Sequence, residues 1–254
     1  MSIVLAALDT TAAARPVLET ALRIGELTAG KVEAVHVRIP SESVETPESL
    51  ARRSGVPLRL LTGPVVPALL AASGAPDVIA VVIGARATPS GRRPVGRVAR
   101  QVLEKTDKPV VVVPPEAVSP GVLRRLLIPL EGTELSSRPV IDQLRPLIVT
   151  DIDALVLHVF TDATLPVMID HPEYDMELLG TEFLTRHFPH TTHIELRPGP
   201  VAKRVAEVAA QHGSDLVVLS WSQTNSPDRA TVVREVLAAS ALPVLLLPAP
   251  TPPG

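Results

Sequence analysis

The stretch TGPVVPALLAASGAPDVIAVVIG, residues 62–84, returns in altered form as PGPVAKRVAEVAAQHGSDLVVLS at residues 198–220. The two copies align Gly63 with Gly199 at a constant offset of 136 residues. Each combines a segment of helical spacing with a short, continuous apolar run, and such runs are typical of strands covered on both faces. A helix-to-strand unit that occurs twice predicts a duplicated α/β fold.

Three further segments repeat in the same order. IVLAALDTT near the N-terminus matches LLIPLEGTE, which pairs Asp9 with Glu131, and EAVHVR matches LVLHVF, which pairs His36 with His158. GRVARQVLEKTDKPVVVVP matches ATVVREVLAASALPVLLLP. The second copy holds about fourteen extra residues between its second and third strands. We predict two domains, residues 1–115 and 122–249, joined by the linker PPEAVSPG, whose prolines and glycine suit a connection.

Within each copy, strands alternate with helices, which predicts parallel strands joined by right-handed crossovers. The fold class is therefore α/β, with two doubly wound parallel five-stranded sheets and helices on both faces. The last strand of each copy, VVVVP or VLLLP, would be an apolar edge prone to aggregation if it were exposed. We expect the two copies to pair through these strands as an internal pseudo-dimer, with further homo-oligomers left open.

Composition excludes several classes of protein. The 254 residues include 46% hydrophobic residues and carry a formal net charge of −3 with 2% aromatic residues, which argues against a nucleic-acid groove. Apolar runs are too short for a membrane span, and the N-terminus leads straight into a strand-like segment, so we expect a cytoplasmic location without membrane contact. The absence of cysteine excludes disulfides and thiol catalysis.

The segment VIGARATPSGRRPVGRVA suggests a site for phosphate. A strand ending in Gly84 leads through a loop to a helix that starts near Gly96, and such a turn presents backbone amides and the positive end of a helix dipole to an anion. The loop region adds four arginines with charge-assisted hydrogen-bonding capacity, Arg86, Arg92, Arg93 and Arg97. The alternative is a solvated turn with its charges facing water.

Asp9 follows the first strand. It is placed to accept hydrogen bonds from a ribose or a base, or alternatively to cap the N-terminus of the following helix. The two repeated histidines lie inside apolar strands, and we expect them to be hydrogen-bonded core or sheet-end residues, not catalysts.

These landmarks together resemble those of tandem universal stress proteins. In that family the first strand ends in aspartate, as in AALDTT, the second ends in HV, and the fourth leads into a glycine-rich motif before the last helix and a PV strand. The resemblance covers nearly the whole chain and implies a stress-response protein of nucleotide-binding-like fold that binds ATP or AMP. The site that the resemblance implies is Asp9, Val37, Gly84, Ala87, Gly96, Arg97 and Val98, with adenine near Asp9 and Val37. The charge argument for the loop adds Arg86 to these residues.

The sequence departs from the family pattern at two of these positions. Ala87 stands where the family has its second glycine, and a methyl group there would be costly if the backbone needs a positive φ. Arg97 replaces a small hydroxyl residue and would either add charge or fill the pocket. The second copy has lost most of the motif, so we expect it to bind no nucleotide; its equivalent residues are Glu131, Ser220, Gln223, Ala230 and Thr231.

Known catalytic motifs are missing from the sequence, including the glycine fingerprint of dehydrogenases, the phosphate loop of NTPases and the nucleophile elbow. A histidine-rich run in the insertion, with His187, His190 and His193, resembles a zinc site, but Pro189 interrupts any helix that would align it, and we predict no metal. The leading hypothesis is a non-catalytic sensor of adenine nucleotide, with slow ATP hydrolysis left open. The alternative is a scaffold that binds no nucleotide and acts through protein contacts.

Overall fold

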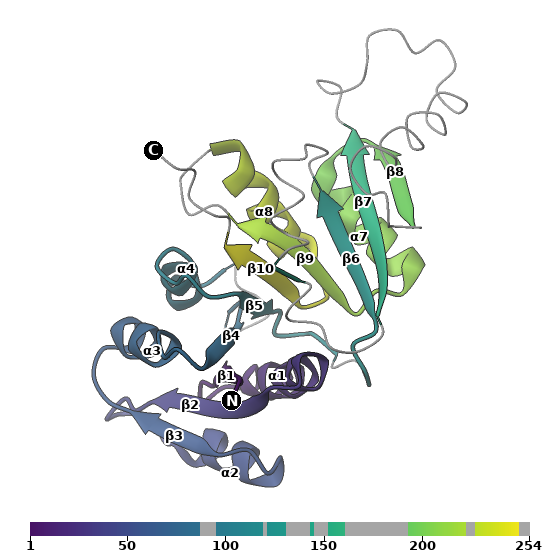
Figure 1. The fold of residues 1–254 in the computed structure, drawn as a ribbon. Coiled ribbons are helices and arrows are strands. Elements are labelled where there is room, and N and C mark those ends of the chain that lie inside the picture. Colours follow the sequence, from purple (N-terminus) through teal and green to yellow (C-terminus); the bar gives the residue numbers. More distant parts are fainter. Residues whose placement is uncertain are drawn as a thin grey trace, which may run out of the picture.

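A computed structural model describes residues 1–86, 95–118, 121–130, 143–144, 152–160, 193–221 and 227–248 (Figure 1). The first half contains β1 (Ile3–Ala7), α1 (Ala14–Thr28), β2 (Lys31–Val37), α2 (Glu45–Arg53), β3 (Leu58–Leu61), α3 (Val65–Ser73), β4 (Val78–Gly84), α4 (Arg97–Leu103) and β5 (Val110–Val113). The second half contains β6 (Arg125–Leu130), β7 (Asp153–Phe160), β8 (Ile194–Pro198), α7 (Val201–His212), β9 (Leu216–Trp221), α8 (Pro227–Ala239) and β10 (Val244–Pro248).

The strands form one ten-stranded sheet in the order β3-β2-β1-β4-β5-β10-β9-β6-β7-β8. Each half contributes five parallel strands, as the sequence predicts, and the winding reverses beside β1 and again beside β6. Instead of remaining two separate sheets, the halves are continuous through one antiparallel pair of strands. Figure 1 shows β5 and β10 side by side at the centre of the molecule.

The predicted pairing of the two terminal strands is confirmed. Val110, Val111 and Val112 of β5 lie opposite Leu246, Leu245 and Val244 of β10. All six side chains are at most 5% exposed, so the apolar edges of the two halves shield each other from solvent. The duplicated fold thereby builds its own internal pseudo-dimer.

Two apolar cores cover the two faces of this sheet. Residues of α3, α4, α7 and α8 pack on one face, and residues of α1 and α2 pack on the other together with Leu144. Each core contains buried residues from both halves, because β5 and β10 carry it across the seam. The helix after the arginine loop, α4, buries Val102 and Leu103 in the first of these cores.

The repeat extends to individual hydrogen bonds. Nδ1 of His36 lies 2.9 Å from the carbonyl oxygen of Leu8, and Nδ1 of His158 lies 3.0 Å from that of Leu130. Both rings are buried, which confirms the expectation of hydrogen-bonded histidines at the sheet end. In each half this bond ties the second strand to the end of the first, at Leu8 directly after β1 and at Leu130, the last residue of β6.

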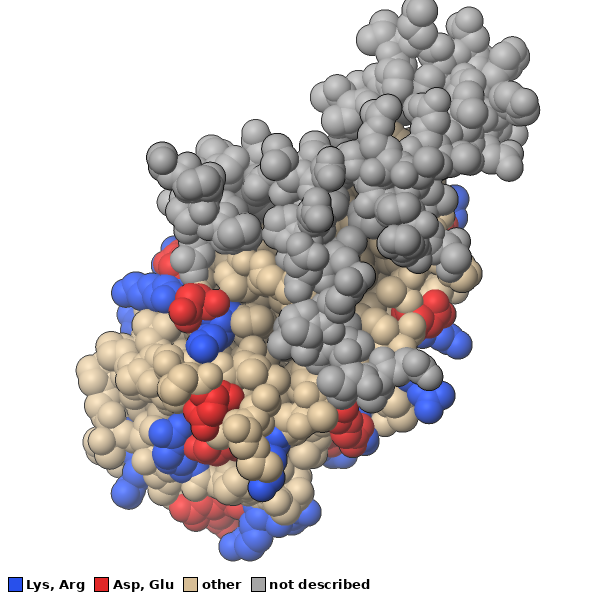
Figure 2. Space-filling model, viewed as in Figure 1, with Lys and Arg blue, Asp and Glu red and all other residues tan. Residues whose placement is uncertain are grey.

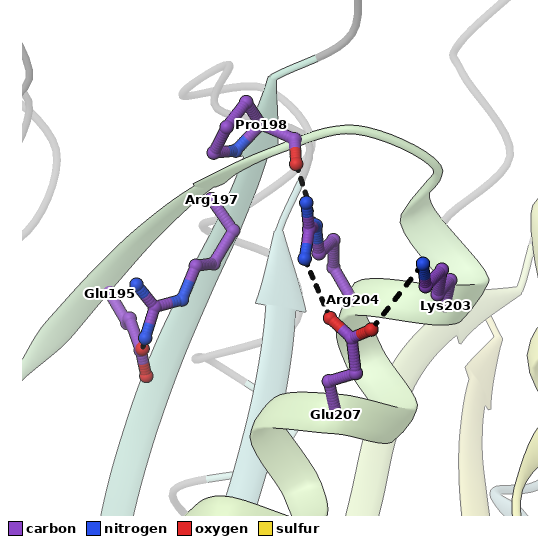
Figure 3. Close-up of polar contacts among 6 residues, drawn as sticks. All are labelled: Glu195, Arg197, Pro198, Lys203, Arg204 and Glu207. Atoms are coloured by element: carbon purple, nitrogen blue, oxygen red, sulfur yellow. Dashed lines mark hydrogen bonds and ion pairs between the residues drawn. The ribbon is translucent and has the colours of Figure 1, made fainter. Parts of the chain in front are cut away.

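A charged cluster surrounds the turn between β8 and α7 in the second half (Figure 3). Nε of Arg204 donates to the carbonyl oxygen of Pro198 at 2.7 Å, and Nη1 donates to Glu207 at 2.7 Å. Lys203 also pairs with Glu207, and Arg197 pairs with Glu195. The hydrogen bond from Arg204 lowers the pKa of Glu207, so this contact stabilises the fold above the ordinary glutamate pKa and loses its effect as the pH falls through the lowered value.

Gly199 and its counterpart Gly63 lie shortly before α7 and α3 in left-handed conformations, with φ of 120° and 100°. A Cβ at Gly199 would lie 3.2 Å from Nε of Arg204, whereas a Cβ at Gly63 meets nothing within 4 Å. We expect Gly63→Ala to lower the free energy of unfolding by about 1–3 kcal/mol through backbone strain alone. Gly199→Ala should cost more, because it also displaces Arg204 from Pro198.

Urea denaturation of the two variants measures both costs. When Arg204→Ala is added to each variant, the extra loss of unfolding free energy caused by Gly199→Ala should disappear. The loss caused by Gly63→Ala should stay the same. Equal costs for the two glycine variants would contradict the assigned role of Arg204.

The described helices include none that is long and apolar enough to span a bilayer. On the face seen in Figure 2, basic and acidic side chains are interspersed over both halves of the molecule. This mixture of signs agrees with the small net charge of −3.

Candidate functional site

A cleft of about 400 Å³ opens at the carboxyl ends of β1, β2 and β4. It lies beside the point where the winding of the first half reverses, which is where doubly wound sheets bind ligands. Its walls come from the ends of these strands, the loops after β1 and β2, and the first turns of α3 and α4. The lining residues are Ala7, Leu8, Asp9, Thr10, Thr11, His36, Val37, Ile39, Glu42, Val65, Leu69, Ile83, Gly84, Ala85, Arg86, Gly96, Arg97, Val98 and Ala99.

The structure brings together seven of the eight residues of the predicted site. Asp9 and Val37 come from the ends of β1 and β2, Gly84 and Arg86 from the end of β4, and Gly96, Arg97 and Val98 from the start of α4. The eighth, Ala87, lies outside the described residues, as do Arg92 and Arg93.

The interpretation of Asp9 as a helix N-cap is wrong. Helix α1 starts at Ala14, and its N-cap residue is Ala13, without a side-chain cap. Asp9 Oδ1 instead accepts hydrogen bonds from the backbone N–H of Thr11 at 2.9 Å and from its hydroxyl at 2.8 Å. Both bonds use the same oxygen, so Oδ2 of this exposed carboxylate is available to a ligand in the cleft.

The loop after β2 carries an acidic residue that the sequence analysis did not single out. The hydroxyl of Thr10 donates to Oε2 of Glu42 at 3.3 Å, which links the loops after β1 and β2 across the mouth of the cleft. No sequence motif marks Glu42, because its role follows from the pairing of β1 with β2.

The two glycines of the site also hold the strand and the helix around the cleft in place. Gly96 is the N-cap of α4 in an extended conformation, and its N–H donates to the carbonyl oxygen of Ala85 at 2.7 Å, so this amide is already occupied. A Cβ at Gly84 would point toward Val17 of α1, at 3.5 Å. Gly96 thus ties α4 to the end of β4, and contact of a ligand with the backbone at these glycines stays a prediction.

The two described arginines of the cleft differ in their contacts. Arg86 forms an ion pair with Glu116 of the interdomain linker, with its Nη2 3.1 Å from Oε1. Arg97 is exposed at the rim of the cleft, and it makes no ion pair with any described residue. Of the two described arginines that line the cleft, Arg97 is therefore the one that can bind an anionic ligand without breaking an ion pair.

Trp221 links the second half to this site. Its Nε1 donates to the carbonyl oxygen of Leu103 at 3.3 Å, at the C-terminal end of the helix whose first residue is Arg97. In the repeat, Trp221 takes the position of Ala85, a small residue in the wall of the first cleft. An indole at this position is one reason to expect no matching nucleotide site in the second half.

Solved structures of similar fold cover both halves of the chain. A universal stress protein from Archaeoglobus fulgidus DSM 4304 superimposes with a TM-score of 0.65 at 13% identity, over 98% of this chain and 98% of its own. This chain has the fold of a tandem universal stress protein. A functionally unknown protein from Pseudomonas aeruginosa PAO1 shares this fold with a TM-score of 0.71 and 12% identity, over 98% of this chain and 93% of its own.

A protein from Pseudomonas aeruginosa UCBPP-PA14, provisionally named a universal stress protein, gives a TM-score of 0.68 at 12% identity, over 98% of this chain and 93% of its own. No family model and no curated protein matches the sequence of this chain. The likeness is therefore one of architecture.

The remaining site predictions concern metal. The described residues contain no group of three or more side chains able to hold a metal ion. Of the histidine-rich run in the insertion, His193 lies within the described residues, and His187 and His190 lie outside them.

Proposed function

We propose that the cleft of the first half binds an adenine nucleotide, ATP or AMP, and that the protein acts as a non-catalytic nucleotide sensor in a stress response. The observation that carries the proposal is the convergence of Asp9, Val37, Gly84 and Arg97 on one cleft at the switch point of the sheet. A volume of about 400 Å³ is within the range of small-ligand sites.

The cleft has residues suited to each part of a nucleotide, namely the base, the ribose and the phosphate. Val37, Ile39, Val65 and Leu69 provide apolar surface on which a flat base packs. Oδ2 of Asp9 accepts hydrogen bonds from ribose hydroxyls. The guanidinium of Arg97 donates to phosphate oxygens.

Isothermal titration calorimetry with ATP and AMP tests this function. We expect one equivalent of nucleotide per chain. Arg97→Ala should weaken AMP binding about tenfold or more, the size of a lost charge-assisted hydrogen bond, while adenosine binding stays within about twofold of the wild type. Absence of heat with both nucleotides on folded protein would refute the proposal. Assay of released phosphate tests whether slow ATP hydrolysis accompanies binding.

A second candidate function, a scaffold without nucleotide, is favoured by one contact. The linker carboxylate of Glu116 holds Arg86 and offsets its charge at the cleft wall. If this pair competes with a phosphate for Arg86, Glu116→Gln should raise AMP affinity by about fivefold, since an exposed ion pair contributes about 1 kcal/mol or less. The same calorimetric titration measures this change. A Glu116→Gln variant that binds no nucleotide, beside a wild type that binds none, would support the scaffold.

A further inference from the structure

His36, the next-to-last residue of β2, lines the cleft and is 3% exposed. Its Nδ1 lies 2.9 Å from the carbonyl oxygen of Leu8. A carbonyl oxygen only accepts hydrogen bonds, so Nδ1 donates and carries the proton. In this tautomer of the neutral ring, Nε2 presents a lone pair and acts as an acceptor.

Nε2 of His36 is buried and has no hydrogen-bond partner. A buried acceptor without a donor is unfavourable, and native structures seldom leave one unsatisfied unless a ligand or water completes it. The geometry thus holds a fixed acceptor on a residue that lines the cleft.

The second half gives an internal comparison. His158 makes the same Nδ1 contact with the carbonyl oxygen of Leu130, and its ring packs edge-on against Phe160 with centroids 4.5 Å apart. At the position of Phe160 the first half has Arg38. The repeat has kept the tautomer-fixing contact in both halves, while the aromatic neighbour is missing from the half whose histidine borders the cleft.

We propose that Nε2 of His36 accepts a hydrogen bond from an N–H or O–H group of the bound ligand, and that this contact selects ligands with a donor at that place. The inference rests on the proposed nucleotide function. Adenine nucleotides carry such donors on the exocyclic amino group and on the ribose hydroxyls. A ligand that presents an acceptor or nothing there leaves the buried lone pair unpaired, and sites of this kind reject such analogues strongly.

The test uses His36→Asn on the full chain. The asparagine amide can still donate to the carbonyl oxygen of Leu8, but it has no acceptor at the place of Nε2. We expect AMP affinity to fall at least about tenfold by calorimetry. The matched control, His158→Asn, alters the equivalent residue of the other half and should leave AMP affinity unchanged.

Three analogues of AMP identify the donor in the wild type. Inosine monophosphate replaces the amino group by a carbonyl oxygen, and 2′-deoxy-AMP and 3′-deoxy-AMP each lack one hydroxyl. We expect one of the three to bind at least about tenfold more weakly than AMP, and this discrimination to disappear in His36→Asn.

A nuclear magnetic resonance readout does not depend on the variants folding. In ¹H–¹⁵N spectra of the imidazole rings of the wild type, saturation with AMP should shift Nε2 of His36 and leave Nε2 of His158 in place. AMP binding with an unmoved Nε2 signal, or equal binding of AMP and all three analogues, would overturn this inference while the nucleotide function stands. A wild type that binds no nucleotide would overturn both.

Discussion

Val111→Asp is expected to unfold both halves of the protein together. Val111 has no exposed surface and lies opposite Leu245 at the antiparallel seam. A carboxylate there has no partner and loses its hydration, which costs at least about 4 kcal/mol, a large share of the stability of a typical domain. Because both cores continue across the seam, loss of β5 also exposes apolar surface of the second half.

Circular dichroism and the emission of Trp221, the single tryptophan of the chain, follow the two halves during denaturation. Val118→Asp adds the same charge at a linker residue that is 85% exposed, and it should be neutral. Val111→Ala removes side-chain volume without adding a charge. The difference in unfolding free energy between Val111→Ala and Val111→Asp therefore gives the cost of the buried charge. Retention of a folded second half in Val111→Asp would contradict the shared core.

Gly96→Val is expected to abolish nucleotide binding at the cleft. A Cβ at Gly96 would already lie 3.4 Å from the carbonyl oxygen of Ala85 and 3.9 Å from Cα of Arg86. The two further methyl groups of valine must push α4 away from the end of β4, which moves Arg97 and Val98 out of the cleft wall. We expect AMP affinity to fall at least about a hundredfold, since misplaced binding groups lose most of their interaction.

Gly96→Ala is the graded control for this prediction. Its single methyl group makes ordinary contacts, and the φ of −68° suits any residue, so binding should remain within about fivefold of the wild type. Thr231→Val, at the position of Arg97 in the second half, should have no effect. Calorimetry measures affinity, and Trp221 emission reports whether α4 has moved at Leu103. Binding by Gly96→Val as strong as that of the wild type would exclude α4 from the site.

Much of the fold could be predicted from the sequence, because the repeat reveals the order of the elements and the apolar runs mark buried strands. The run VIAVVIG is β4 from end to end, and the apolar VVVV and VLLLP runs led directly to the seam between β5 and β10. Edge strands of this kind need cover, and the pairing follows from that need. The two halves share both cores because residues pack across the seam. Local sequence patterns do not predict such contacts.

The candidate site was predicted in position but not in detail. Strand ends mark where residues gather, so Asp9, Val37 and Gly84 could be placed in one cleft before the structure was known. The hydrogen-bond partners could not, since they join residues distant in sequence: Arg86 to Glu116, Thr10 to Glu42, and Trp221 to Leu103. The free Nε2 of His36 is likewise invisible in a pattern that shows only a histidine in an apolar strand.

A crystal structure of the full chain grown with AMP tests the central claim most directly. We predict one nucleotide per chain in the cleft of the first half, with its phosphate in contact with Arg97 and its ribose or base in contact with Asp9. An AMP molecule bound in the second half, or a first-half cleft filled by Arg97 itself while AMP is present in excess, would contradict the account.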